Sequence, residues 1–353
     1  MMIRFRSYIL ALCTAASACV WAQESPVQVH GNVQFNSLLA QEDEAIGAQK
    51  YDQPFRFNTY ADFGLTSKYV DAGLRFEFME YPMPGYEPDF KGWGVPNLYV
   101  KGKFKGFEVT AGSIYEQFGS GLVLRLYEDR PLGIDNALSG ARLKVNAING
   151  VRLTVLGGTQ RRYWHWDWHS QVYGADAEVY MDDLVSSIRN RGAAWMLGAS
   201  YVLNHPADAD IRVTGTDFRL NLPSTVSSMD FRTRLTKGAW SVLAETAFKG
   251  QDPTVGNAYT YRDGSVYLLS ASYSRSGLSA LVQAQRNSNF MMRSQRTITG
   301  ISAMLNNMPA FAYQHTYSLA AMYPYATQSI PGEWAYQAAL TYKFKRGTAM
   351  GGK

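Results

Sequence analysis

Apolar and polar residues alternate along most of this chain, in segments of about ten residues. One face of segment 69–81 would carry Val70, Ala72, Leu74, Phe76 and Phe78. The opposite face would carry Asp71, Gly73, Arg75 and Glu77. Because alternate side chains of a β-strand point to opposite sides, each segment predicts a strand with one apolar and one polar face.

The alternation predicts about fifteen strands, near residues 27–38, 55–66, 69–80, 97–103, 107–116, 138–146, 151–158, 172–181, 193–203, 227–236, 239–249, 265–274, 278–286, 313–323 and 333–345. Short and long connections alternate between them. Transmembrane barrels join strands of about 9–11 residues in this way. The pattern therefore predicts an all-β chain, a transmembrane antiparallel up-and-down β-barrel with about 14–16 strands in this sequence. A water-soluble β-protein is the alternative.

The predicted odd number of strands has a consequence for the C-terminus. It would leave that end among the long loops, whereas single-chain bacterial barrels have even strand numbers. The last residues, KRGTAMGGK, also read as the start of another long loop. We therefore expect a truncated sequence, with strands missing after Lys353. A miscount by one strand is the alternative explanation.

The composition agrees with a sheet that has one wet face and one oily face. Aromatic residues make up 14% of the chain, which suits the aromatic girdles of a membrane barrel. The formal net charge is +5, Arg4 and Arg6 contribute two of these charges, and basic residues are not clustered. Nucleic acid is therefore not an expected partner.

The first residues have the form of a secretory signal peptide, predicted over 1–22. Two arginines precede an apolar stretch, and Ala22 ends a small-residue cleavage site. The barrel would occupy 23–353, where no segment is apolar over 18 consecutive residues. Both cysteines, Cys13 and Cys19, lie in the leader, so neither a disulfide nor a thiolate metal site is expected in the exported chain.

The long connection 117–137 mixes apolar and charged residues, which is unusual for a solvated outer loop. We expect it to fold into the lumen and narrow it, because apposed acids and bases across a pore select solutes by charge. A loop lying over the barrel mouth is the alternative. The candidate pore residues, from this loop and from the inward strand faces, are Arg75, Glu77, Arg125, Glu128, Asp129, Arg130, Arg142, Arg232 and Arg234.

The stretch RRYWHWDWHS alternates three tryptophans with His165, Asp167 and His169. On a curled loop these three side chains could bind Zn²⁺ or Cu²⁺. On a flat strand they would span roughly 13 Å, too far for one ion. We instead expect a register break at Gly157-Gly158 that turns the tryptophans outward as an aromatic rim and the histidines toward water. A sugar-stacking loop is a third interpretation, and no cofactor is expected.

The stretch GSIYEQFGSGLVLRLYEDRPLGIDNALSGARLKV, Gly112 to Val145, resembles a family of outer-membrane proteins from Bacteroidetes, the domain of unknown function DUF6029. The later AETAFKGQDP resembles the same family, and the likeness extends over the whole chain. The resemblance implies a barrel fold and an outer-membrane location, but no activity and no site residues. Chains of this family tend to be longer, in line with the expected truncation.

The function that follows is a porin-like channel of a Gram-negative outer membrane, which small polar solutes cross by passive diffusion. Its partners would be outer-membrane lipid and those solutes, with a homo-oligomer or an envelope complex as a further alternative. A structural or surface-binding barrel with an occluded lumen is the first alternative function. An outer-membrane enzyme is the second. The sequence has no Gly-x-Ser-x-Gly elbow and no His-Glu-x-x-His motif, so no catalytic residue is assigned and an enzyme is not expected.

Overall fold

The computed structural model describes residues 27–50, 52–84, 86–166, 168–212, 215–298, 300, 303–306, 332–344 and 347. Fourteen strands follow one another through a single antiparallel sheet, and a short strand, β12 (His165–Trp166), pairs with β11 alone. The fourteen are β1 (Val27–Leu39), β2 (Phe55–Ser67), β3 (Val70–Tyr81), β4 (Gly92–Phe104), β5 (Phe107–Ile114), β10 (Leu138–Val145), β11 (Val151–Arg162), β13 (Gln171–Tyr180), β14 (Ala193–His205), β15 (Val226–Lys237), β16 (Trp240–Lys249), β17 (Gly264–Arg275), β18 (Leu278–Ser288) and β19 (Glu333–Tyr342).

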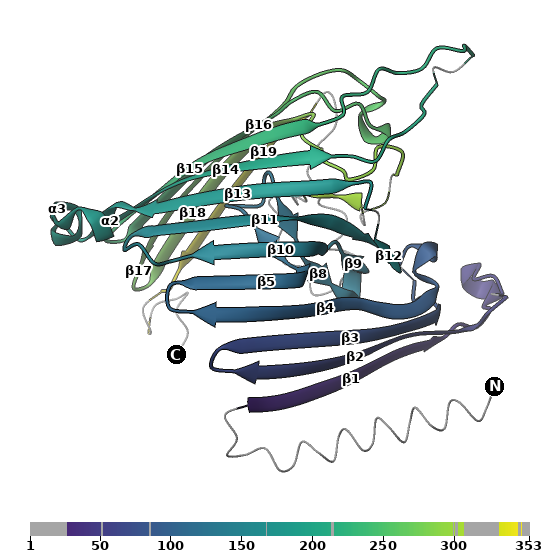
Figure 1. Cartoon of the computed structure of the whole chain (residues 1–353). Helices are drawn as coiled ribbons and strands as arrows, with labels where there is room; N and C mark the ends of the chain where they lie inside the picture. The colour runs from purple at the N-terminus through teal and green to yellow at the C-terminus, as the bar shows by residue number, and fades with distance from the viewer. Residues whose placement is uncertain are drawn as a thin grey trace.

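The sheet curls around a hollow (Figure 1). The short turns lie at one end, together with the small helices α2 (Met181–Leu184) and α3 (Ser186–Asn190), and the long connections lie at the other. Four two-residue strands lie within the hollow, namely β6 (Glu116–Gln117), β7 (Arg125–Leu126), β8 (Glu128–Asp129) and β9 (Ile134–Asp135). Among the described residues β1 and β19 do not pair with each other, so the sheet is open.

The predicted all-β, antiparallel, up-and-down architecture is confirmed. The predicted strand 313–323 lies outside the described residues. Strands β18 and β19 pair directly, from Leu278↔Tyr342 to Asn287↔Glu333. Strand β19 therefore ends beside the short turns, where the Lys343 amide donates to the Gly277 carbonyl at 2.8 Å. The expected truncation after Lys353 stays a prediction.

The two faces of the sheet differ as the alternation predicts. On β15, Met229, Phe231 and Leu235 are exposed on the outward face, whereas Asp230 and Arg232 are buried on the inward face. The same register repeats from strand to strand, because cross-strand partners share a face. The outward face is therefore apolar, whereas the inward face carries the charged side chains together with a buried apolar patch. No described helix is long and apolar enough to cross a membrane.

Candidate functional site

The connection between β5 and β10, residues 115–137, folds into the hollow as the sequence predicts. We call it the inward loop. Its apolar residues Phe118, Leu122, Val123, Leu124 and Leu126 are almost completely buried. Burial against the inner wall removes the apolar surface of these side chains from water, and this stabilises the inward position of the loop.

A cluster of five ionised side chains joins the inward loop to the wall. Arg75 on β3 lies at its centre, with Nε 2.7 Å from Glu77, Nη1 2.7 Å from Glu128 and Nη2 2.7 Å from Asp135. Arg161 on β11 bridges two of these acids, with Nη2 2.9 Å from Glu77 and Nη1 on Asp135. Glu128 and Asp135 come from the loop, so these pairs connect β3, the loop and β11. We call this set the Arg75 cluster.

The local backbone places Arg75 and Glu77 side by side on the inward face. Pairing of β3 with β4 shifts between Arg75↔Asn97 and Glu77↔Gly94, so that Val95 and Pro96 form a bulge. Proline has no amide to donate and is tolerated at such a bulge. At this bulge the Ser113 hydroxyl, rather than a backbone group, accepts the hydrogen bond from the Leu98 amide at 3.0 Å.

Tyr115, at the start of the inward loop, completes the Arg75 cluster. Its hydroxyl donates to Asp135 at 3.1 Å and accepts from Arg75 Nη2 and Asn97 Nδ2, each at 3.3 Å. Burial raises the pKa of Tyr115 well above its ordinary value, and the charge of Asp135 raises it further. The phenol therefore remains protonated and acts as a donor to the carboxylate.

Glycine lets the tip of the inward loop touch the far wall. Gly119 has a φ of +54°, and a Cβ there would meet Glu245 Oε1 at 2.5 Å and Arg232 Cδ at 2.9 Å. The next residue, Ser120, donates its amide to Glu245 of β16 at 2.9 Å. A side chain at position 119 would break this contact.

The other end of the inward loop reaches the first strands of the sheet. Arg130 Nη2 lies 3.0 Å from Asp62 of β2, and Nη1 donates to Gln34 of β1 at 3.1 Å. Its Nε also pairs with Glu128 at 2.6 Å. Burial alone would lower the pKa of Arg130, but Glu128 and Asp62 outweigh it and raise that pKa. The loop thus spans the hollow from β16 to β2.

A second segment, residues 289–306, folds inward from the connection after β18. Its described part buries Phe290, Met292 and Leu305. The Leu305 carbonyl accepts from the Arg125 amide at 2.8 Å, and the Met304 carbonyl accepts from Asn136 and Gln160 at 3.0 and 2.8 Å. The sequence analysis missed this second inward segment, although the apolar run at 290–292 is a signal for burial.

The two inward segments share one dry core with the wall. It contains Ile114, Phe118, Leu122, Val123, Leu124, Leu126, Leu138, Leu156, Val172, Val202, Ala247, Val266, Phe290, Met292 and Leu305. All are at most 3% exposed. Part of the described hollow is therefore packed like a protein interior and holds no water path.

Asn306 fastens the two inward segments to each other. Its Nδ2 donates to the carbonyls of Leu122 and Phe290 at 2.9 and 2.8 Å, and its Oδ1 accepts from the Met292 amide at 2.9 Å. We expect Asn306→Ala to lower the free energy of unfolding by about 2–3 kcal/mol, because buried groups lose their partners. Hydrogen exchange should speed up in both segments. Asn149→Ala is the control, because exposed Asn149 makes one 3.3 Å bond, and an equal effect of both variants would contradict the assignment.

Between the inward loop and the short turns, the inner wall borders a polar hollow of about 590 Å³. Its charged lining residues are Glu116, Lys144, Arg152, Asp176, Glu178 and Asp183. Lys144 pairs with Glu116 at 2.7 Å, and Arg152 donates to the Tyr180 hydroxyl at 3.0 Å. Both signs of charge line this space, which is wide enough for small solutes.

The predicted pore residues separate into distinct places. Arg142 holds the start of the inward loop through Glu116 at 3.0 Å and also pairs with Glu108 at 2.7 Å. Arg232 forms a separate buried cluster on β13 and β15 with Asp176, Glu178 and Asp230 at 2.6, 3.1 and 2.9 Å.

Three of the predicted pore residues stand apart from these clusters. Arg125 stacks on Tyr127 with its guanidinium carbon 4.6 Å from the ring centroid. Asp129 caps a short 3-10 helix, η4 (Arg130–Leu132), by accepting from the Leu132 amide at 3.3 Å. Arg234 is exposed and belongs to neither cluster. That these residues line a conducting pore stays a prediction.

The Arg75 cluster also contains a group of acids with metal-ligand spacing. Ligand oxygens of Glu77, Glu128 and Asp135 lie within 4.8 Å of one another. The guanidinium groups of Arg75 and Arg161 already pair with these oxygens. The two arginines therefore already supply the positive charge that a metal ion would bring. The arrangement fits a set of ion pairs that locks the inward loop to the wall better than it fits a metal site.

The predicted register break at Gly157-Gly158 is wrong. Strand β11 pairs with β10 without a shift from Leu153 to Gln160. The chain reverses later, at Tyr163 with a φ of 51°, so that β12 folds back on β11. The end of β11 extends beyond its pairing with β10 and forms a hairpin with β12. The chain therefore turns at Tyr163 and not at the two glycines.

The reversal also changes the place of the tryptophans and histidines. Trp164 packs with a buried cluster formed by Tyr60, Met79 and Phe90, and its indole donates to the Lys91 carbonyl at 3.1 Å. Trp168 is exposed, as are both His165 and His169. Asp167 lies outside the described residues, so the metal interpretation stays a prediction.

Arg161 is the residue that the sequence analysis missed at this site. Alternation on β11 turns Val151, Leu153 and Val155 outward, so Arg161 should also point outward. Yet it is 2% exposed and faces Asp135 of the inward loop, while Phe90, from the connection after β3, lies with its ring centroid 5.6 Å from the guanidinium carbon. The direction of the Arg161 side chain is fixed by its contact with Asp135, which lies 26 residues away in the sequence.

Several solved porin structures are similar to this chain. Acinetobacter baumannii OccAB1 is 11% identical over 74% of this chain and 65% of its own, with a TM-score of 0.42. Pseudomonas aeruginosa OccK11 is 13% identical over 74% and 62%, with a TM-score of 0.39. Pseudomonas aeruginosa OpdO is 13% identical over 91% and 87%, with a TM-score of 0.38.

Curated protein sequences contain no match to this chain. A family model does match, and it covers residues 2–353. The model describes a family of unknown function, DUF6029. This match confirms the resemblance seen in the Gly112–Val145 stretch, and the chain belongs to the DUF6029 family.

Proposed function

We propose that this chain forms a β-barrel of a Gram-negative outer membrane and acts as a porin-like channel for passive diffusion of small polar solutes. The observation that carries the proposal is the contrast between the two faces of one sheet. Exposed outward residues include Val33, Leu98, Val109, Leu143, Val155, Val242, Leu269, Val282 and Leu340. An apolar surface that crosses all strands is far larger than a water-soluble protein exposes.

Aromatic residues border this apolar surface at both ends of the strands. Tyr69, Phe104, Phe107, Trp240 and Tyr342 are exposed near the short turns. Phe35, Phe55, Trp93, Tyr173, Phe248 and Trp334 are exposed near the long connections. On β16, Trp240 and Phe248 are about 26 Å apart along the strand at ~3.3 Å per residue. A band of about 25 Å between aromatic girdles is typical of outer-membrane barrels.

The inward face supports passage of polar solutes. The inward loop narrows the space inside the sheet, and the polar hollow of about 590 Å³ offers charges of both signs below it. Paired charges of both signs favour weak selection between anions and cations. Outer-membrane lipid and small polar solutes are the proposed partners, and export by the leader predicted over 1–22 is part of the proposal.

Planar-bilayer recording of the refolded chain tests the channel. We expect discrete conductance steps that are weakly ion-selective. Swelling of vesicles that contain the protein should depend on solute size. A chain that inserts into the bilayer without any conductance step would contradict the channel.

The dry core favours a second candidate, a structural or surface-binding barrel whose lumen is occluded. Fifteen buried apolar residues fill part of the hollow and include both inward segments. In that case the protein inserts, gives no conductance steps and is recovered with a stable envelope partner after mild detergent extraction. Recording and recovery together therefore separate the two candidates.

The membrane-facing side can be tested with one pair of adjacent substitutions. Val282 on β18 points outward and is 59% exposed, whereas the next residue, Gln283, points inward and donates to Ser270. We expect Val282→Lys to lower the free energy of unfolding in vesicles by about 2–4 kcal/mol, since lysine would lie in hydrocarbon. Gln283→Lys is the control and should change it by less than about 1 kcal/mol. Equal effects in denaturant titrations would place the outward face in water.

A further inference from the structure

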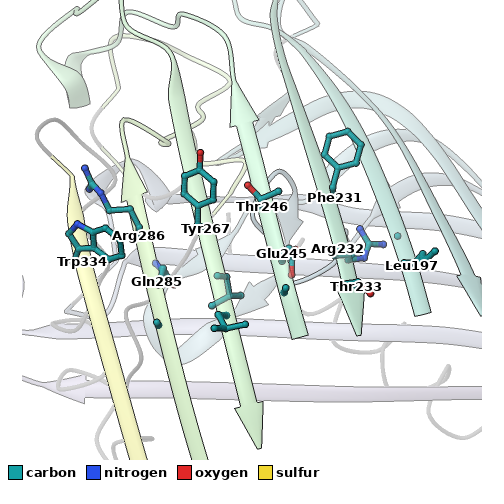
Figure 2. Close-up of a pocket in the computed structure, with 15 residues that line it drawn as sticks. Leu197, Phe231, Arg232, Thr233, Glu245, Thr246, Tyr267, Gln285, Arg286 and Trp334 are labelled. Atoms are coloured by element: carbon teal, nitrogen blue, oxygen red, sulfur yellow. The ribbon is translucent and has the colours of Figure 1, made fainter. Parts of the chain in front are cut away.

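A groove of about 670 Å³ crosses the outward face of the sheet from β14 to β19 (Figure 2). Two rows of cross-strand neighbours border it. One row holds Phe231, Thr246, Tyr267, Arg286 and Trp334, and the other holds Leu197, Thr233, Ala244, Leu269 and Ala284. The row between them points to the other side of the sheet, so its backbone forms the floor.

Side-chain size explains the depression. Thr233, Ala244 and Ala284 are small, whereas Phe231 and Trp334, at the two ends of the other row, are large. The lining is almost entirely apolar carbon. Its volume falls within the roughly 300–1,000 Å³ of sites that take small ligands.

Arg286 is the one charged side chain that points outward among the residues that line this groove. Arg232 and Glu245 also line it, but they belong to the inward row and are buried there. The Arg286 Nη1 donates to the Asn287 carbonyl at 2.6 Å, and its guanidinium carbon lies 5.5 Å from the Trp334 ring centroid. Its Nε and Nη2 make no hydrogen bond to a described residue, so these donors remain available.

We propose that this groove binds one acyl chain of an anionic membrane lipid, with Arg286 holding the lipid phosphate. The inference rests on the proposed membrane location of the outward face. An arginine that faces lipid is unfavourable unless it lies near the interface or has an anionic partner. Arg286 lies two positions before the end of β18 at Ser288. This is the level of the exposed aromatic residues near the long connections, where lipid phosphates reside.

The neighbouring groups fit the two parts of such a lipid. The Tyr267 side chain is half exposed beside Arg286 in the same row, and its hydroxyl offers a further donor to phosphate. Arginine favours phosphate through two parallel donors, and the free Nε and Nη2 form such a pair. The acyl chain then lies over Ala244 and Ala284, where it covers apolar surface.

Native mass spectrometry of the full chain, released from vesicles of equal parts phosphatidylglycerol and phosphatidylcholine, tests the site. We expect retention of one phosphatidylglycerol, about tenfold over phosphatidylcholine, in line with one charge-assisted contact. Arg286→Gln should abolish this preference. Arg275→Gln is the matched control, because Arg275 also points outward but lies at the short-turn end of β17, and it should keep the preference.

A second variant tests the apolar part separately. Ala284→Phe fills the groove, and retention of phosphatidylglycerol should fall although Arg286 is intact. Equal retention of the two lipids, or an unchanged preference in Arg286→Gln, overturns the proposal. Release of the lipid by inorganic phosphate alone would overturn the acyl part. A chain that inserts and conducts but shows no lipid preference overturns this inference alone, whereas a chain that does not insert overturns the proposed function.

Discussion

Arg75→Met is expected to lower the free energy of unfolding by about 3–5 kcal/mol, the largest effect of any single substitution proposed for this chain. Arg75 is 3% exposed, and its guanidinium meets three carboxylates. Without it, buried Glu77 and Asp135 keep Arg161 as their cationic partner, and Glu128 keeps Arg130. Removing one partner of a buried network leaves uncompensated charge.

Denaturant titration of the refolded chain in detergent, followed by tryptophan fluorescence, measures this effect. The matched control is Arg189→Met, because the Arg189–Asp183 pair is 57% and 45% exposed and an exposed pair contributes about 0–1 kcal/mol. Arg75→Lys should recover only part of the loss, since lysine cannot hold three acids in one plane. An unfolding midpoint of Arg75→Met within error of Arg189→Met would refute the lock.

Replacing the inward loop by a two-residue turn is expected to raise single-channel conductance several-fold. Ile114 and Leu138 are opposite each other in the ladder between β5 and β10, so Asn-Gly in place of residues 115–137 closes an ordinary hairpin. The tethers to Glu245 and Asp62 disappear, and the space between β16 and β2 opens to water. Conductance follows the cross-section of the narrowest part of a pore.

Planar-bilayer recording measures this change, and a second deletion controls for the loss of chain. Shortening 208–222, part of the connection between β14 and β15 at the outer end of the sheet, should leave conductance unchanged. Steps of equal size in the loop-replacement variant and the unmodified chain would exclude the inward loop as the constriction. Lower stability of the variant is expected as well, because Leu156, Val172 and Val202 lose their apolar cover.

The strands could be predicted from the sequence because their signal is local. A period of two along β3 or β15 reports which face each side chain occupies without any knowledge of its neighbours. The inward loop was also predictable, since five apolar side chains between charged ones cannot all be solvated in an outer connection. Register within the sheet was not predicted, and the break expected at Gly157-Gly158 is absent.

The contents of the hollow could not be predicted in the same way. Arg161 turns toward Asp135 because the two side chains pair, not because of its own neighbours in sequence. The reversal at Tyr163 requires a positive φ, and no glycine at this position indicates it in the sequence. Asn306 gains its role from carbonyls 16 and 184 residues away. These features depend on tertiary contacts, and one sequence contains no record of such contacts.

The bond between Asn306 and the Leu122 carbonyl also constrains the order of folding. Every strand of the main path pairs with the next one on that path, so the sheet can grow by nearest-neighbour steps. The Asn306 bond instead joins positions separated by 184 residues, so its closure costs more chain entropy than the pairing of neighbouring strands. Assembly should therefore have two kinetic phases, a fast growth of the wall and a slower sealing of its interior. During the interval between them the barrel interior is hydrated and sensitive to proteases.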